Sequence, residues 1–356
     1  MSLGPLMLDL RGPVLEQDEK EMLRHPLVGG VILFARNFTD PVQLADLTRR
    51  VHNLRHPRLL IAVDHEGGRV QRFRDQFTRM PPCSRYGEIY DKNRRRALTI
   101  TEKAGWLLAM ELLSVGVDFS FAPVLDLDTG HGHGHVIGDR AFHRDPQAVA
   151  DLARAFVHGM RAAGMAAVGK HFPGHGSVKE DSHHGTPVDA RRYEDILMKD
   201  MVPFERLIDA GLAGIMPAHV IYSQVDDKPA GFSSIWLQEI LRNRLEFKGV
   251  IFSDDISMEG AGTAGDYKGR ALAALAAGCD MVLICNNQEA AGKLLGDLDI
   301  ERNPVSQVRL MRMHGQEIKL TMAKLKDSAK WRTAADEIAA IERVPELDLG
   351  DDEIQT

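Results

Sequence analysis

The strongest constraint on the fold is an alternation of short apolar segments with longer amphipathic segments, which continues to about residue 300. The short segments have the length of strands and are apolar at successive positions, so both of their faces must be buried. Strands of that kind occur in parallel sheets that are covered by helices. The sequence contains eight such candidate strands, at residues 6–10, 30–34, 59–63, 118–125, 166–170, 213–216, 249–252 and 280–284.

The segments between the candidate strands carry helix signals. Residues 41–47 follow Asp40, a suitable N-cap, and begin with Pro41 at the first helical position; residues 146–163 begin in the same way after Asp145. Eight strand–helix repeats in this length favour a closed barrel over an open doubly wound sheet. No glycine-rich dinucleotide fingerprint follows the first strand. We therefore predict an α/β protein with a (β/α)8 TIM-type barrel.

The pattern changes beyond the last candidate strand. Residues 306–330 are helical in pattern and rich in charge, and residues 346–353 form an acidic tail. Such a segment is typical of helices that pack on the outside of a domain and end in a frayed terminus. We expect a single domain, with a catalytic barrel over residues 1–300 and a C-terminal helical extension with its tail over residues 301–356.

Composition excludes several classes of protein. With 44% hydrophobic residues the chain can bury a large core, and its net charge of −7 is the wrong sign for neutralising nucleic-acid phosphates. The three cysteines are too few for a disulfide framework and indicate a reducing compartment. The first ten residues lack the basic start of a signal peptide, and no window reaches the roughly 20 apolar residues of a membrane span. We expect a cytoplasmic protein without nucleic-acid or membrane partners.

Polar side chains collect directly after the candidate strands. In a (β/α)8 barrel the catalytic groups lie beyond the carboxyl ends of the strands. One polar residue at a strand end has a simple explanation, because strands end where the chain meets water. Six strand ends with charged, imidazole or amide side chains instead predict a functional site at the barrel mouth. These residues are Asp64, His65, Glu66 and Arg69; Asp126 and Asp128; Lys170 and His171; His219; Asp254 and Asp255; Asn286 and Asn287.

The loop after the fifth strand, residues 170–185, is the richest in titratable groups. It contains four histidines, and Asp181 lies two residues before His183. In an extended segment these two side chains project to the same side, so the carboxylate can set the imidazole tautomer. That arrangement suits a general acid/base near neutral pH. A solvated histidine-rich loop is the alternative explanation.

Several longer motifs stand at the predicted strand ends. They are Lys-His-Phe-Pro-Gly-His-Gly at 170–176 with Asp-Ser-His at 181–183, Asp-His-Glu-Gly-Gly-Arg-Val-Gln-Arg at 64–72, Val-Ile-Gly-Asp-Arg-Ala-Phe at 136–142, and Gly-Val-Ile-Phe-Ser-Asp-Asp-Ile-Ser-Met at 249–258. Together these motifs resemble glycoside hydrolase family 3, and within it the single-domain bacterial β-N-acetylglucosaminidases of peptidoglycan recycling. They occur on at least four predicted strands, in the order expected of that family, and cover nearly the whole barrel.

The resemblance implies a role for individual residues. It implies Asp254 as the nucleophile, and His183 as the acid/base with Asp181 as its partner. Two features depart from the family: His65 occupies a position that is usually Gln, and histidines alternate at 131, 133 and 135. The roles of His65 and Asp255 stay open. The sugar-binding positions that the resemblance implies are Asp64, Arg72, Arg140, Lys170 and His171.

The implied chemistry is retaining hydrolysis of a glycosidic bond, which needs an attacking carboxylate and an acid/base. A histidine has a reference pKa of about 6.5, and when neutral it adds no second negative charge opposite the nucleophile. We expect an exo-β-N-acetylglucosaminidase (a β-N-acetylhexosaminidase) that removes terminal GlcNAc from GlcNAc–1,6-anhydro-MurNAc muropeptides through a covalent glycosyl-aspartate. The resemblance implies no cofactor and no metal, and we expect a monomer or weak homo-oligomer.

Two other enzyme classes compete with this interpretation. A metal-dependent hydrolase is possible because barrels often bind zinc at strand ends, and His131, His133 and His135 alternate. The lysine and arginine at the mouth disfavour binding a cation. A glycoside phosphorylase could use the same Asp254 and His183. A sugar-binding protein on an inactive barrel is disfavoured, because both proposed catalytic residues are present.

Overall fold

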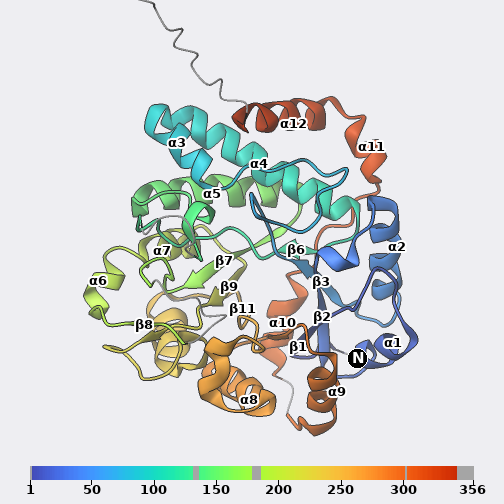
Figure 1. Cartoon of the computed structure of the whole chain (residues 1–356), viewed down its shortest axis with the longest axis vertical. Helices are drawn as coiled ribbons and strands as arrows, with labels where there is room; N and C mark the ends of the chain where they lie inside the picture. Colours follow the sequence, from blue (N-terminus) through green and yellow to red (C-terminus); the bar gives the residue numbers. More distant parts are fainter. Residues whose placement is uncertain (1, 131–135, 179–185, 301–302, 343–356) are drawn as a thin grey trace, which may run out of the picture.

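Eight parallel strands form the centre of the molecule in the computed structural model, which describes residues 2–130, 136–178, 186–300 and 303–342 (Figure 1). Each strand pairs with its neighbours in chain order, and β12 pairs with β1. A parallel bridge between Phe252 and Met281 joins β11 to β12 and closes the circle. The predicted closed barrel is confirmed. Its strands are β1 (Leu6–Asp9), β2 (Val28–Leu33), β3 (Leu60–Val63), β6 (Phe119–Ser120), β7 (Ala166–Phe172), β9 (Gly214–Pro217), β11 (Val250–Ile251) and β12 (Val282–Ile284).

Helices surround the strands on the outside (Figure 1). Asp40 and Asp145 cap α2 and α5 as predicted, because their carboxylates accept hydrogen bonds from the first free backbone N–H groups of each helix. The helices are α1 (Gln17–Leu23), α2 (Pro41–His52), α3 (Ser84–Lys92), α4 (Arg94–Ser114), α5 (Pro146–Ala163), α6 (Tyr193–Leu197), α7 (Val202–Asp209), the π-type helix η4 (Ile235–Arg244), α8 (Tyr267–Ala277), α9 (Gln288–Asp297), α10 (Pro304–Met311), α11 (Met322–Lys326) and α12 (Ala329–Glu342).

Short strands and 3-10 helices lie in the connections between the barrel strands and helices. β4 (His65–Gly67) and β5 (Val70–Gln71) form an antiparallel hairpin after β3, and β8 (Val188–Asp189) pairs with β10 (Ile221–Tyr222). Short 3-10 helices occur at η1 (Ala35–Asn37), η2 (Gly138–Arg140), η3 (Ala230–Phe232) and η5 (Glu259–Ala264).

The fourth strand is shorter than predicted. Residues 118–125 form a strand only over Phe119–Ser120, followed by an isolated bridge between Val124 and Lys170. Pro123 interrupts the ladder because proline has no backbone N–H to donate. The chain nevertheless stays beside β7, since the carbonyls of Ala122 and Pro123 accept hydrogen bonds from Val168 and Lys170.

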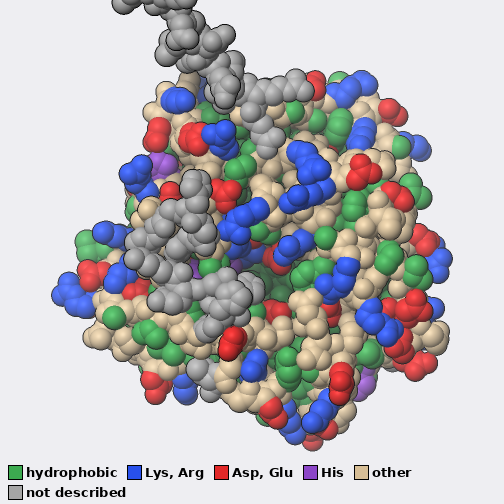
Figure 2. Space-filling model, viewed as in Figure 1, with side chains coloured by type: hydrophobic (Ala, Val, Ile, Leu, Met, Phe, Trp, Pro, Cys, Tyr) green, Lys and Arg blue, Asp and Glu red, His purple; other side chains and the backbone are tan. Residues whose placement is uncertain are grey.

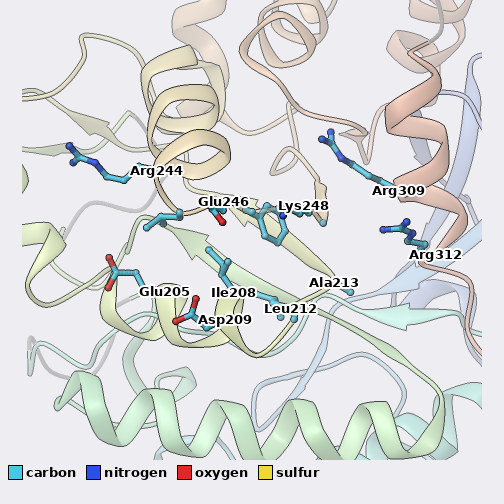
Figure 3. Close-up of a pocket in the computed structure, with 14 residues that line it drawn as sticks. Glu205, Ile208, Asp209, Leu212, Ala213, Arg244, Glu246, Lys248, Arg309 and Arg312 are labelled. Carbon is cyan, nitrogen blue, oxygen red and sulfur yellow. The ribbon is translucent and has the colours of Figure 1, made fainter.

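The two ends of the barrel differ in character. At the carboxyl ends of the strands lies a cleft of about 830 Å³, and Figure 2 shows Lys and Arg side chains gathered around a hollow on this face. A second cavity of about 700 Å³ lies at the opposite end, before β9 and β11 (Figure 3). Its charged residues carry both signs, with Glu205 and Asp209 from α7 across from Arg309 and Arg312. The amino end of such a barrel contributes to stability, whereas the carboxyl end carries function.

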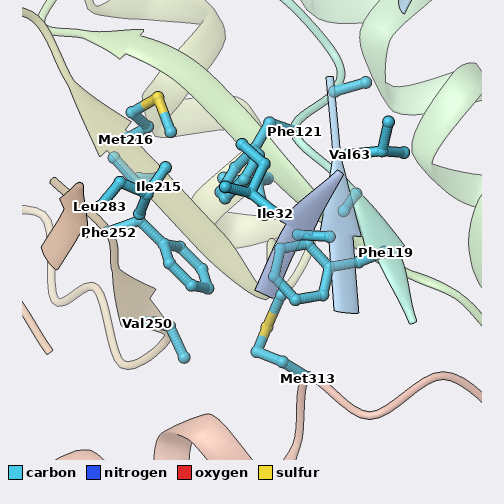
Figure 4. Close-up of a cluster of buried hydrophobic side chains, with 14 of the residues drawn as sticks. Ile32, Val63, Phe119, Phe121, Ile215, Met216, Val250, Phe252, Leu283 and Met313 are labelled. Carbon is cyan, nitrogen blue, oxygen red and sulfur yellow. The ribbon is translucent and has the colours of Figure 1, made fainter. Parts of the chain in front are cut away.

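A packed apolar core separates these two ends. The rings of Phe119, Phe121 and Phe252 lie with each pair of centroids 5.3 Å apart inside the barrel, and Met313 belongs to the same buried cluster (Figure 4). Met313 is fully buried. The barrel is therefore filled by side chains and is not a channel. Cys83, Cys279 and Cys285 are also buried and unpaired, in agreement with a role as small core residues.

The chain after residue 300 contacts the barrel closely. In α10, the Ser306 hydroxyl and the Arg309 guanidinium bind the Asp280 carboxylate at 2.6 and 3.0 Å. Farther along, α12 packs on α4, and Trp331 Nε1 donates to Glu111 at 2.9 Å. The division at residue 300 stays a prediction. Within the described residues no helix is long and apolar enough to cross a membrane.

Candidate active site

The cleft at the carboxyl ends brings together most of the predicted site residues. Asp181 and His183 lie outside the described residues, as do His131, His133 and His135. The remaining predicted residues all line the cleft, although they come from the end of β7 and from the connections after β3, β6 and β11. They are Asp64, Arg72, Arg140, Lys170, His171 and Asp254.

Lys170 is the centre of a buried charge network. Its Nζ lies 2.7 Å from Asp64 Oδ1 and 2.7 Å from Glu66 Oε1. Glu66 in turn receives two 2.8 Å hydrogen bonds from the Arg140 guanidinium. Two-point contacts of this kind fix the orientation of both groups. The network therefore holds Asp64, Lys170 and Arg140 in set positions at the floor of the cleft.

Glu66 has a role that the sequence motifs did not assign. Burial alone would raise the pKa of Glu66, but the charges of Arg140 and Lys170 outweigh burial and hold that pKa well below its usual range. Its carboxylate is thus ionised and neutralises two cations. The signal was available in the sequence, because Asp64 and Glu66 lie two apart in extended chain and so face the same side.

Successive side chains in extended chain point to opposite sides, so His65, between Asp64 and Glu66, points away from the cleft. Its ring is buried against the rings of Phe73 and Phe77, at centroid distances of 5.7 and 5.9 Å. Burial, together with the Arg72 charge, lowers the pKa of His65 to about 3. The residue is therefore neutral near pH 7 and contributes to packing behind the site.

Asp254 stands just beyond β11, with its side chain partly open to the cleft. Its Oδ1 accepts a 2.8 Å hydrogen bond from the Asp255 backbone N–H. Burial raises the pKa of Asp254, but the imidazoles of His219 and His171 and this hydrogen bond lower it to below its usual value. The carboxylate is thus anionic at neutral pH, as a nucleophile requires.

Asp255 has the opposite electrostatic environment. Burial raises the pKa of Asp255 to about 6. Its Oδ1 accepts hydrogen bonds from the backbone N–H groups of Ser257 and Cys285, at 2.9 and 3.1 Å, and its Oδ2 accepts from the Ser257 hydroxyl at 2.6 Å. These contacts connect the segments after β11 and β12. The Asp255 carboxylate therefore holds the backbone segments beside Asp254 in place.

Three further polar residues near the strand ends are buried: Asp126, His175 and His219. His219 Nε2 lies 3.2 Å from the Asp255 carbonyl oxygen. The Asp126 carboxylate contacts His171. Among the described residues, neither ring nitrogen of buried His175 has a hydrogen-bond partner, and burial lowers the pKa of His175 to about 4. The sequence marked Asp126 and His219 as strand-end groups but gave them no role.

The described residues contain no group of three or more His, Cys, Asp or Glu side chains that could bind a metal ion. Two carboxylates of the cleft are instead paired with cations: Asp64 with Lys170 and Arg72, and Glu66 with Lys170 and Arg140. This distribution of charge is suited to an uncharged, hydroxyl-rich ligand, whose groups can both donate and accept hydrogen bonds.

Comparisons with known proteins agree on one family. The model of the glycosyl hydrolase family 3 N-terminal domain matches residues 7–313. A β-hexosaminidase of Thioalkalivibrio sulfidiphilus is 59% identical over 349 residues, covering 98% of this chain and 99% of its own. A β-hexosaminidase of Methylobacillus flagellatus is 55% identical over 341 residues, covering 96% of this chain and 97% of its own.

Solved structures show the same similarity. NagZ from Neisseria gonorrhoeae in complex with N-trifluoroacetyl-D-glucosamine superposes with a TM-score of 0.89 at 44% identity, covering 96% of this chain and 98% of that one. A family 3 β-N-acetylglucosaminidase from Paenibacillus has a TM-score of 0.84 at 28% identity, covering 95% of this chain and 67% of that one.

Proposed function

The chain belongs to glycosyl hydrolase family 3 and is a β-hexosaminidase, and from this premise we propose that it is a retaining exo-β-N-acetylglucosaminidase with Asp254 as its nucleophile. One observation carries the assignment of the nucleophile. Asp254 is the carboxylate of the cleft whose pKa is lowered while no Lys or Arg side chain forms an ion pair with it among the described residues. An anionic oxygen at the rigid end of a strand is ready to attack.

The reaction proceeds in two displacements. Asp254 attacks the anomeric carbon while the bond to the leaving oxygen breaks, and that oxygen takes a proton from His183. The product is a glycosyl ester on Asp254. Neutral His183 then removes a proton from a water molecule, which attacks the same carbon and releases both the sugar and the Asp254 carboxylate. The resemblance to the family assigns His183 this role and Asp181 the role of its partner.

The charge network supports recognition of a sugar. The Asp64 carboxylate can accept hydrogen bonds from two neighbouring hydroxyls, and Lys170 and Arg72 beside it can donate to hydroxyl oxygens. The N-trifluoroacetyl-D-glucosamine in the gonococcal relative supports an N-acylated amino sugar as the ligand here. We assign as substrate the terminal β-linked GlcNAc of GlcNAc–1,6-anhydro-MurNAc muropeptides, cleaved in the cytoplasm during peptidoglycan recycling.

The decisive experiment is to trap the covalent intermediate. Incubation with a 5-fluoro N-acetylglucosaminyl donor, followed by peptide mass spectrometry, should label the peptide at Asp254. The Asp254→Asn variant should lose hydrolysis of an aryl N-acetyl-β-glucosaminide by on the order of 10⁴-fold or more, because a neutral amide cannot form the ester. The control Asp297→Asn, at the exposed end of α9, should keep the wild-type rate. Label on another residue, or an active Asp254→Asn, would remove the proposed mechanism.

The same assay separates the competing enzyme classes. Treatment with a chelator should leave the rate unchanged, and a loss that zinc restores would favour the metal-dependent hydrolase. Addition of inorganic phosphate should not change the product. Formation of N-acetylglucosamine 1-phosphate would instead identify a glycoside phosphorylase.

A further inference from the structure

Asp126, after β6, and His171, near the end of β7, form a buried pair that the proposed mechanism does not use. We propose that Asp126 is a positioning residue, which holds the His171 imidazole by Nδ1 so that Nε2 can accept a hydrogen bond from the sugar. The proposal rests on the proposed function only for the identity of the ligand.

Asp126 is completely buried and accepts hydrogen bonds from two residues of the loop. Its Oδ2 lies 2.6 Å from His171 Nδ1. Its Oδ1 accepts from the backbone N–H groups of His171 and His175, at 3.2 and 2.7 Å. One carboxylate thus binds the His171 side chain and the backbone N–H groups of His171 and His175, which are 45 and 49 residues away in the chain.

The loop base is also packed tightly against the segment that follows Asp126. A Cβ added at Gly176 would lie 2.1 Å from the Leu127 carbonyl oxygen, so only glycine fits there. The Thr129 hydroxyl donates a hydrogen bond to the Gly176 carbonyl oxygen. Residues 126–129 therefore form a rigid support for the first turns of the loop.

The contact with Asp126 determines which nitrogen of His171 carries the proton. A carboxylate accepts and cannot donate, so Nδ1 must carry a hydrogen. In the neutral ring Nε2 then keeps its lone pair and acts as an acceptor. His171 lines the cleft, where this acceptor can bind a sugar hydroxyl.

The chain offers a matched control at the other end of the same strand. Asp118 precedes β6 as Asp126 follows it, and it too is buried beside histidine: its Oδ2 lies 3.2 Å from His52 Nε2. It also accepts backbone hydrogen bonds from Ile61 and Gly315. The same substitution at Asp118 tests the loss of a buried carboxylate far from the cleft.

The first measurement reads the tautomer directly. Nitrogen NMR of protein with isotopically labelled histidine should show His171 protonated at Nδ1, with the resonance identified by its loss in His171→Gln. Asp126→Asn places an amide N–H opposite Nδ1, so the ring proton should move to Nε2. A wild-type spectrum with unprotonated Nδ1, or an unchanged tautomer in Asp126→Asn, overturns the proposal. This readout does not depend on activity.

The second measurement is a double-mutant cycle on an aryl N-acetyl-β-glucosaminide. Asp126→Asn should lower kcat/KM by roughly 10- to 100-fold, by analogy with the carboxylates that orient metal-bound histidines. The double variant Asp126→Asn/His171→Gln should be no slower than His171→Gln alone, because Asp126 acts through His171. Asp118→Asn should lower the melting temperature and leave kcat/KM of the folded enzyme unchanged.

The outcomes distinguish this inference from the proposed function. Losses that multiply in the double variant would show that Asp126 acts independently of His171 and would overturn the inference. An unchanged kcat/KM in Asp126→Asn would do the same. A wild-type enzyme that hydrolyses no GlcNAc glycoside would refute the proposed function, while the His171 tautomer would still decide the inference.

Discussion

At the residue scale, neighbours in the sequence have opposite roles when they face opposite sides or have different partners. Asp64 and Glu66 point into the cleft, whereas His65 between them packs on Phe73 and Phe77. The adjacent carboxylates of Asp254 and Asp255 differ as strongly, because the pKa of Asp254 is lowered and the pKa of Asp255 is raised to about 6. Such divergence between nearby acids is typical of sites that need one of them ionised.

The first prediction concerns the stability contributed by neutral His65. Its pKa is about 3 in the folded protein and about 6.5 when unfolded, so the unfolded chain binds more protons between these values. Stability is then fully present above pH 6.5 and is lost as the pH falls toward 3. His65→Gln removes this titration. Between pH 7 and 5 the free energy of unfolding of the wild type should therefore fall by up to about 2 kcal/mol more than that of the variant.

Urea unfolding at several pH values measures this difference. His158→Gln, at an exposed helical histidine, serves as the control and should follow the wild-type pH dependence. Parallel pH profiles for wild type and His65→Gln would refute the prediction. Activity at pH 7 should change little, because His65 does not line the cleft.

At the element scale, buried aspartates fix the amino ends of the strands to the C-terminal segment. Asp118, before β6, binds Arg58 at 2.9 Å and the Gly315 backbone N–H. Asp280, before β12, binds Arg242 and Arg309 and accepts from the Ile251 backbone N–H at 2.9 Å. The periodicity of the sequence predicted both strands. It could not predict these contacts, because their partners lie far away in the chain.

The second prediction tests the Asp280 contact. Asp280→Asn leaves the mostly buried Arg242 guanidinium without its counter-charge, and should lower the free energy of unfolding by about 3–5 kcal/mol. The exposed pair of Asp46 with Arg50 is the comparison, where Asp46→Asn should cost less than about 1 kcal/mol. Urea denaturation measures both. Equal losses in the two variants would contradict the prediction, and kcat of folded Asp280→Asn should stay at the wild-type value.

At the scale of the whole molecule, residues beyond 300 help to fill the barrel. Met313 belongs to the same buried cluster as Phe119, while Met311, two residues earlier, is 45% exposed (Figure 4). The expected boundary at residue 300 therefore separates segments that share one core, although it follows the end of the strand–helix repeat.

The third prediction uses these two methionines. Met313→Ala should lower the free energy of unfolding by about 2–5 kcal/mol, because it leaves a cavity in the packed core. Met311→Ala should change it by no more than about 0.5 kcal/mol. Thermal and denaturant unfolding of both variants measure the difference. A Met313→Ala variant as stable as Met311→Ala would show that the barrel end can collapse around the smaller side chain.

The sequence by itself determined the barrel, because strand and helix periods, caps and apolar runs are local signals. It also determined where the polar strand ends lie, and thereby that Asp64, Lys170 and Asp254 meet at one mouth. The roles of His183 and Asp181 stay predictions. The tertiary structure alone decided which buried group each carboxylate contacts: Glu66 with Arg140, Asp126 with His171, and Asp255 with Cys285. Hydrogen bonds and charge interactions depend on distances through space, and closure of the barrel sets those distances.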